Sequence, residues 1–257
     1  MFNALAEPRN ARRSSPPELG IGLARSQADL SDAFRLIFQS YFQAGLVSQK
    51  PSGIRLTPHH LLPTSEVLVA RHRGKITSTV SLFGDGKLGL PMQTMYPQQI
   101  NQLRDQGIRL AEVGSLADER KSQIRFIDTF AQLGRLLAQL AYARGYDGLV
   151  AVTHPKHARL YRRVMGFNQI GDLSDCPYAN GNPAVALYLS FHEHRGTDLY
   201  DQYFGEAIPQ KDLAAYRWPE ETRRHFRKIL ERDHIVGSAA GIQGYYTWAC
   251  VSGNAAK

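Results

Sequence analysis

The chain has 257 residues, of which 43% are hydrophobic, and this composition supports a substantial core and excludes a mainly disordered protein. The 31 lysines and arginines outnumber the 23 acidic residues and give a net charge of +8. Acidic partners are therefore expected: nucleic acid, anionic lipid or an acidic carrier protein. Only two cysteines, Cys176 and Cys250, are present and lie far apart. A disulfide framework is not expected, and a cytoplasmic location is favoured.

Neither a membrane span nor an export signal is predicted. A span needs roughly 20 apolar residues, and the most apolar segment, 126–144, is interrupted by Asp128 and Arg135. Near the N-terminus, Arg12 and Arg13 are not followed by an apolar run. Residues 1–18 are predicted to form a flexible tail.

The first part of the chain predicts a strand, a helix and a hairpin. A short apolar run at 21–24 precedes apolar residues spaced three and four apart over 30–41, which indicates an amphipathic helix. Residues 50–63 carry three prolines and two adjacent histidines without a period, so a loop is expected. Segments 66–70 and 76–83 flank a polar turn and are predicted to pair as an antiparallel hairpin.

The middle of the chain is dominated by a long helix. A polar surface helix is expected over 96–107 and an extended segment over 109–117. The long helix spans about 124–144, with one apolar stripe and an opposite polar face that includes Arg135 and Gln139. We expect this helix to lie across a sheet.

The next segment predicts a strand, a short helix and two closing strands. Residues 149–152 form a short apolar run typical of a strand buried on both faces. The helix that begins at Pro155 is predicted to end at Gly166, in the left-handed conformation. Strands at 167–170 and 184–191 close the sheet. The two strands that flank the long helix are expected to run parallel, joined by a right-handed crossover.

This order of elements, with the sequence Leu-Tyr-Arg-Arg-Val-Met-Gly-Phe at 160–167, resembles the GNAT acyltransferases. The resemblance implies an α/β fold: a mixed sheet with a splayed parallel strand pair and helices on both faces. The GNAT-like domain would occupy residues 19–191. Residues 192–257 would be a C-terminal helical extension of unassigned fold, with one helix predicted over 219–232.

Two further segments narrow the resemblance. Residues 82–92, which contain Gly84-Asp85-Gly86 and Gly89-Leu90-Pro91-Met92, and the run Leu-Ala-Glu-Val-Gly-Ser-Leu-Ala at 110–117 resemble the bacterial long-chain N-acyl amino acid synthases. This GNAT branch is related to the acyl-homoserine-lactone autoinducer synthases, in which a Ser-Arg-Phe segment follows the strand glutamate. Here Gly114-Ser115-Leu116 occupies that place, which favours an amino acid acceptor. The implied reaction is transfer of an acyl group from an acyl carrier protein thioester to the amine of an amino acid.

The resemblance also implies catalytic roles. Glu112 would be the general base, or would orient a water relay; the alternative is a carboxylate paired with Arg109. Tyr161 would protonate the leaving thiolate, and a core tyrosine is the alternative. Backbone N–H groups on the same strand would stabilise the oxyanion, and these belong to Val113, Gly114, Ser115 and Leu116.

Other residues are candidates for substrate contacts. His154 and His157 stand where the buried strand meets its helix, and we expect them to cap the helix or to contact a substrate carboxylate. No third ligand accompanies them, so no metal is expected. Met92 is a candidate wall of the acyl channel, although core packing explains apolar residues equally well. Cys176 has no identifiable base beside it and is not expected to be a nucleophile.

The turn at 118–123 bears on the acyl donor. It contains no glycine, whereas CoA-dependent GNAT enzymes usually hold the pyrophosphate with a glycine-rich turn at this point. The single phosphate of an acyl-phosphopantetheine arm is therefore favoured, and no permanently bound cofactor is expected. Candidate ligands for that phosphate are Arg120, Lys121 and Arg125, and candidate docking residues for an acidic carrier protein are Lys156, Arg159, Arg162 and Arg163. For each of these residues a solvated helix face is the alternative.

Three other functions stay open at this point. The chain could be an acyl-CoA-dependent or autoinducer-type enzyme, or a GNAT scaffold that binds a carrier protein without catalysis. It could also be a nucleic-acid-binding module, because the predicted C-terminal helix is strongly basic. Those basic residues are Arg223, Arg224, His225, Arg227, Lys228 and Arg232. No interleaved aromatic residues or binding motif accompany them, so nucleic acid is the least favoured partner.

Overall fold

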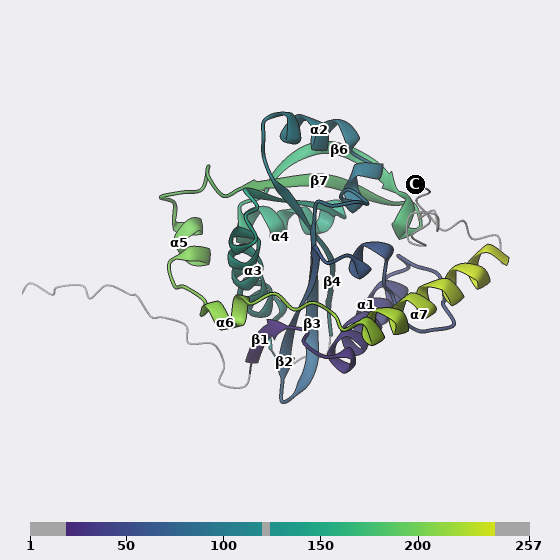
Figure 1. Ribbon diagram of the computed structural model, residues 1–257. Helices are drawn as coiled ribbons and strands as arrows, with labels where there is room; N and C mark the ends of the chain where they lie inside the picture. The colour runs from purple at the N-terminus through teal and green to yellow at the C-terminus, as the bar shows by residue number, and fades with distance from the viewer. Residues whose placement is uncertain (1–18, 120–123, 240–257) are drawn as a thin grey trace, which may run out of the picture.

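A seven-stranded sheet organises the chain in the computed structural model, which describes residues 19–119 and 124–239 (Figure 1). Its strand order is β1-β2-β3-β4-β5-β7-β6, and the pair β4–β5 is parallel while the other neighbours are antiparallel. The strands are β1 (Leu19–Leu23), β2 (Ser65–His72), β3 (Lys75–Gly84), β4 (Leu110–Asp118), β5 (Gly148–Thr153), β6 (Asn168–Cys176) and β7 (Asn182–Ser190). The expected mixed sheet with one parallel pair is confirmed.

Helices cover both faces of this sheet, as expected. Figure 1 shows α3, α5 and α6 on one side and α1 and α7 on the other. The α-helices are α1 (Gln27–Gln43), α2 (Pro97–Asp105), α3 (Phe126–Ala143), α4 (Pro155–Met165), α5 (Asp198–Phe204), α6 (Gln210–Leu213) and α7 (Glu220–Ala239). Three short 3₁₀ turns are η1 (Pro58–Leu61), η2 (Pro91–Thr94) and η3 (Pro177–Ala179). Among the described residues, no helix combines the length and apolar character that a membrane crossing requires.

Local sequence accounts for where the helices begin and end. Ser26 caps α1 by accepting a hydrogen bond from the Asp29 N–H at 3.0 Å. Pro155 occupies the first turn of α4, where its missing N–H is harmless. Gly166 ends α4 with φ 73°, the left-handed conformation that glycine adopts without steric cost. The predicted limits of this helix are confirmed.

Apolar side chains divide into three cores because alternate strand residues point to opposite faces. The first core lies under α3 and α4 and includes Leu68 of β2. The second core joins α1 and α7 to the other face of β2 and includes Val67. The third core packs α2 and η2 against β5 and β7 on that same second face, and it includes Val150. The second and third cores therefore share one face of the sheet.

The helix α3 is buried on more sides than its sequence predicts. Gln139, expected on a polar outer face, is only 8% exposed. Its Nε2 donates to the carbonyls of Tyr203 and Glu206, and its Oε1 accepts from the Ile208 N–H. The polar face opposite the apolar stripe is therefore covered at Gln139, because the segment carrying α5 and α6 packs over it and supplies hydrogen-bond partners for the buried amide.

The parallel strands β4 and β5 pair over only part of their length. Their register runs from Leu110 opposite Gly148 to Val113 opposite Ala151, and both strands continue beyond that point. Ser115 then adopts φ 53°, and the pairing of β4 with β3 shifts register at the same place. The end of the shared ladder leaves the backbone of β4 unpaired toward β5 at residues 114–116. This is the splayed strand pair that the fold was expected to contain.

Candidate functional site

Glu112 lies in the middle of the sheet, opposite Phe83 of β3 and Val150 of β5. It is 4% exposed, and its Oε2 accepts a hydrogen bond of 2.7 Å from the backbone N–H of Met92. Burial raises the pKa of Glu112 to about 8, although the Met92 N–H acts in the opposite direction. A carboxylate with this pKa is a far stronger base than a solvated one and suits proton abstraction from an ammonium group.

The alternative expectation, an ion pair between Glu112 and Arg109, is wrong. Arg109 lies three residues away on the chain, but its guanidinium pairs with Asp147, with Nη2 2.9 Å from Oδ1. Asp147 also accepts from the Arg109 backbone N–H at 3.0 Å. No ion pair involves Glu112 among the described residues. The carboxyl group is therefore buried without a compensating cation.

Aromatic rings and a buried histidine form the surroundings of Glu112 on this face. His60 packs edge-on against Phe83, with ring centroids 4.8 Å apart. Its Nδ1 accepts from the Thr57 N–H, so its Nε2 carries the proton and donates to Ser81 Oγ at 3.1 Å. Burial lowers the pKa of His60 to about 3, which keeps the ring neutral. This arrangement holds Phe83 beside Glu112.

Tyr161 projects from α4 into the first core. It is 5% exposed and packs edge-on against Phe130 and Phe167, with centroids 5.4 Å and 5.5 Å away. Burial raises its pKa, and the Tyr41 hydroxyl adds to this effect. Tyr41 belongs to α1, on the other face of the sheet. Burial thus favours the protonated form of the Tyr161 hydroxyl.

The strand segment expected to stabilise the oxyanion coincides with the end of the β4–β5 ladder. Val113 is buried in the first core, whereas Gly114, Ser115 and Leu116 are partly exposed. A Cβ at position 114 would lie 2.9 Å from Cε2 of Phe83, so a glycine is needed at this point. Backbone N–H groups of this bulged segment are free of the ladder with β5.

Three other predicted contact residues lie close to the strand ends. His154 caps α4, because its Nδ1 accepts from the Lys156 N–H at 3.1 Å. His157 follows one turn later and is exposed, with its ring centroid 6.1 Å from that of His154. Met92 is completely buried in the third core, and its backbone N–H holds Glu112. Among the described residues, no three His, Cys, Asp or Glu side chains are grouped as metal ligands.

Cys176 lies at the end of β6 with its thiol buried. Burial raises its pKa to about 11, against weaker opposite effects that include hydrogen bonds from Tyr178 and the charge of Arg55. A thiol with this pKa carries almost no thiolate at neutral pH. The protonated state agrees with the expectation that Cys176 is not a nucleophile.

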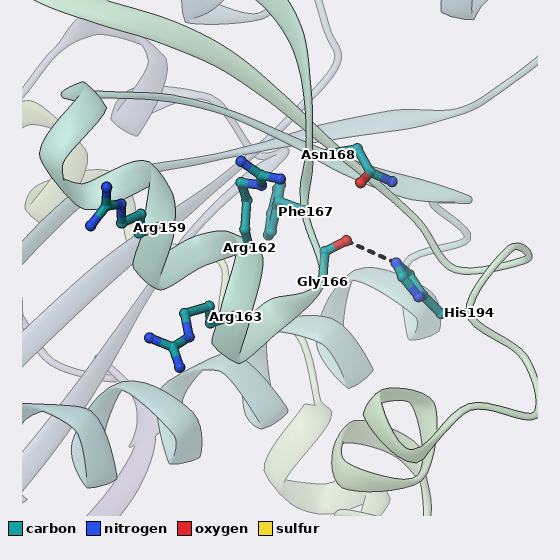
Figure 2. A pocket seen from close by; sticks show the side chains of 7 residues that line it. All are labelled: Arg159, Arg162, Arg163, Gly166, Phe167, Asn168 and His194. Atoms are coloured by element: carbon teal, nitrogen blue, oxygen red, sulfur yellow. Dashed lines mark hydrogen bonds between the residues drawn. The ribbon is translucent and has the colours of Figure 1, made fainter.

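Arginines expected to contact the carrier protein surround one pocket on the outer side of α4. The pocket has a volume of about 420 Å³. Its lining residues are Arg159, Arg162, Arg163, Gly166, Phe167, Asn168 and His194. Figure 2 shows the three arginines on α4 and the hydrogen bond of 2.9 Å from His194 Nε2 to the Gly166 carbonyl. Three positive charges within two helical turns create a strong local attraction for anions.

Of the three residues expected to bind the donor phosphate, the structure describes only Arg125. Arg125 is the N-cap residue of α3, but its side chain makes no capping hydrogen bond. It pairs instead with Asp128, with Nε 2.8 Å from Oδ2. Arg120 and Lys121 lie outside the described residues. Lys156 is exposed on the first turn of α4.

Two residues around this site, His60 and Arg55, were not predicted from the sequence. His60 was expected only within a loop, but it sits on η1 and is 2% exposed. Arg55, on the same loop, lies over the Tyr41 ring with its guanidinium carbon 4.9 Å from the centroid. Neither has a periodic signal, because both stand on irregular backbone. The pair His59-His60 after a proline was the one visible sign that this loop packs inward.

Comparison with known proteins identifies the family. The family model for the N-acyl amino acid synthase FeeM matches residues 32–190. The structure of FeeM from uncultured soil microbes is similar, with TM-score 0.61, 24% identity, and coverage of 72% of this chain and 97% of that chain. The acyl-homoserine-lactone synthase LasI is similar in fold, with TM-score 0.54, 15% identity, and coverage of 74% and 96%. A search of curated proteins returned no match.

These similarities confirm the GNAT-like fold expected from the sequence. The matched residues cover more than half of the chain and include β3, β4, β5 and α4, which carry the candidate site. The chain belongs to the FeeM N-acyl amino acid synthase family, and it is an N-acyltransferase.

Proposed function

We propose that this N-acyltransferase moves an acyl group of the long-chain class from an acyl carrier protein thioester to the amine of an amino acid. The observation that carries the proposal is Glu112, a carboxyl group 4% exposed and held by the Met92 N–H. A group so placed is poised to remove a proton from a substrate ammonium, directly or through a water molecule. The splayed strands beside it provide room for a thioester.

In the proposed reaction, the amine of the acceptor attacks the acyl thioester directly. Glu112 takes one proton from the ammonium, and the free amine then attacks the thioester carbonyl carbon. Backbone N–H groups of residues 114–116 stabilise the oxyanion that forms. As the C–S bond breaks, Tyr161 gives its proton to the departing sulfur, and the surplus proton on nitrogen restores the tyrosine. The products are an N-acyl amino acid, the free thiol of the carrier and one proton, which Glu112 releases to solvent.

The donor side of the proposal is supported by charge. Arg159, Arg162 and Arg163 line the pocket on α4, whose first turn follows β5 directly. An acidic carrier protein would dock on this basic surface, with Lys156 adjoining it. Arg125, together with Arg120 and Lys121, would contact the phosphate of the phosphopantetheine arm. A carrier-protein donor also places the reaction in the cytoplasm.

The acceptor side includes both histidines at the start of α4. His154 caps the helix through Nδ1, so its Nε2 would face a substrate, and the exposed His157 ring one turn later would lie beside it. Met92 and the third core would border the acyl chain. The apolar walls at this point suit a hydrocarbon better than a polar group.

Mass spectrometry tests the proposal. The purified enzyme would be incubated with acyl carrier protein charged with a series of acyl chains and with a mixture of the common amino acids. A product whose mass equals acyl group plus amino acid minus water is expected, and it identifies both substrates. Product from acyl-CoA but from no carrier protein would contradict the donor. Product from neither donor would contradict the reaction.

A further inference from the structure

Arg55 stands in the loop between α1 and η1, on the face of the sheet that carries Glu112. Its guanidinium carbon lies 4.9 Å from the centroid of the Tyr41 ring, a cation–π contact that fixes the orientation of the group. Its Nη2 donates to the Tyr178 carbonyl at 3.3 Å. The side chain is therefore held between α1 and η3 and not spread over the surface.

This guanidinium has more donors than partners. Its Nε is buried and has no hydrogen-bond partner, and no ion pair of Arg55 occurs among the described residues. An arginine offers five N–H donors in a planar fork that matches a carboxylate. Partial burial of such a charge without an anion is costly. The arrangement is thus suited to an anion that arrives from outside.

Neighbouring charges strengthen this local excess of positive charge. The pKa of Lys50 is lowered by burial and further by the charge of Arg55, whereas Asp233 acts in the opposite direction. Asp233 accepts a hydrogen bond from Ser52. Asp233 thus acts on Lys50 and is already hydrogen-bonded, and no carboxylate of the described residues forms an ion pair with Arg55.

Arg55 is also connected to the proposed acid. The ring beneath it belongs to Tyr41, whose hydroxyl lies close enough to Tyr161 to raise the pKa of that residue. The charge of Arg55 in turn opposes the effect of burial, which raises the pKa of Tyr41. Arg55 is thus in direct contact with the tyrosine whose hydroxyl contributes to the raised pKa of Tyr161.

Arg55 is also related to the proposed base, Glu112, through His60 and Phe83. The charge of Arg55 contributes, after burial and His59, to the low pKa of His60. His60 packs against Phe83 at 4.8 Å, and Phe83 stands opposite Glu112 in the β3–β4 register. One cation with unused donors is thus placed on the face of the sheet that carries Glu112, the group that would act on the amine.

We propose that Arg55 binds the α-carboxylate of the amino acid acceptor and so directs its amine toward Glu112. This inference rests on the proposed function and adds to it the group that would select an amino acid over a simple amine. The fork of Arg55 would form two charge-assisted hydrogen bonds to the carboxylate. The nitrogen, one carbon away, would then face the interior of the site.

The test compares an amino acid with its α-carboxamide as the acceptor. The acceptor would be the amino acid that the wild-type enzyme acylates best, measured beside its α-carboxamide at saturating donor. We expect the wild-type enzyme to favour the acid at least tenfold in kcat/KM. Arg55→Gln should raise KM for the acid at least tenfold and leave kcat/KM for the amide within twofold. Arg55→Lys, which keeps the charge and loses the fork, should fall between the two.

Control variants and donor kinetics keep the outcomes separate. Arg35→Gln is the matched control, because Arg35 is an exposed arginine of α1 paired with Asp32, and all its constants should stay within twofold. Equal losses of kcat/KM for the acid and the amide would overturn the inference. A change confined to KM for the donor would also overturn it, because Arg55 would then contact a donor phosphate. Equal use of acid and amide by the wild-type enzyme would also overturn it, even if Arg55→Gln fails to fold. Failure of the proposed function is distinct, because no amino acid would then be acylated at all.

Discussion

Two buried carboxyl groups on the same sheet have different surroundings. Glu66 on β2 is 8% exposed, and Arg144 at the end of α3 donates two hydrogen bonds of 2.6 Å and 3.0 Å to its carboxylate. Glu112 on β4 is 4% exposed and receives one backbone N–H. The first is an ion pair that joins a strand to a helix, and the second is a titratable group without a counter-charge. Burial alone therefore does not distinguish the proposed base from a carboxylate that stabilises the fold, whereas the absence of an ion-pair partner does.

The largest expected effect is the loss of turnover in Glu112→Gln. The amide can still accept the Met92 hydrogen bond but cannot take up a proton, so we expect kcat to fall by about 10²–10⁴-fold. Steady-state kinetics at saturating substrates would measure this fall, and thermal unfolding would check that the variant folds. A variant with wild-type kcat would remove Glu112 from the mechanism.

Glu66→Ala should affect stability instead. It leaves Arg144 partly buried without its carboxylate, while Arg144 keeps its hydrogen bond of 2.8 Å to the Leu213 carbonyl. Breaking a fully buried pair costs roughly 3–5 kcal/mol, and the Arg144 side chain is 24% exposed. We therefore expect a loss of about 2–3 kcal/mol in the free energy of unfolding. Urea denaturation would measure it, and a large fall in kcat of the folded variant would contradict the structural role of Glu66.

Tyr161→Phe extends the comparison to the proposed acid. Loss of the hydroxyl should lower kcat by about 10–100-fold, at the low end of general acid catalysis because a thiolate is a good leaving group. The phenyl ring would keep its contacts with Phe130 and Phe167, so stability should change little. Kinetics and thermal unfolding would be measured together. A destabilised variant with unchanged kcat would make Tyr161 a core residue only.

The raised pKa of Glu112 also predicts a pH trend in stability. The pKa of Glu112 is raised from 4.5 to about 8 by burial, so between these values the native protein binds more protons than the unfolded chain. The contribution of Glu112 to stability is then complete below about pH 4.5 and declines as the pH rises to about 8. Glu112→Gln lacks this decline, so its stability relative to the wild-type protein should improve over that range. Unfolding in urea at pH 5, 6.5 and 8 would measure it, and a constant difference would contradict a raised pKa.

The regular elements were largely predictable from local patterns. The spacing of apolar residues located α3 and the buried strand β5, and Pro155 and Gly166 defined the ends of α4. These features depend on residues a few positions apart, so periodicity and capping are sufficient. The family resemblance added Glu112 and Tyr161 as candidates, and the structure shows that both are buried.

The sequence by itself determined the order of elements, the parallel pair and the family to which the chain belongs. Only the tertiary structure decided which charges have partners. It joined Arg109 to Asp147 and Arg144 to Glu66, and within residues 19–119 and 124–239 it gave neither Glu112 nor Arg55 an opposite charge. These outcomes depend on contacts between residues distant in sequence and on the removal of water around them. No local pattern encodes either quantity, which is why the loop that carries Arg55 and His60 showed no functional signal before the fold was known.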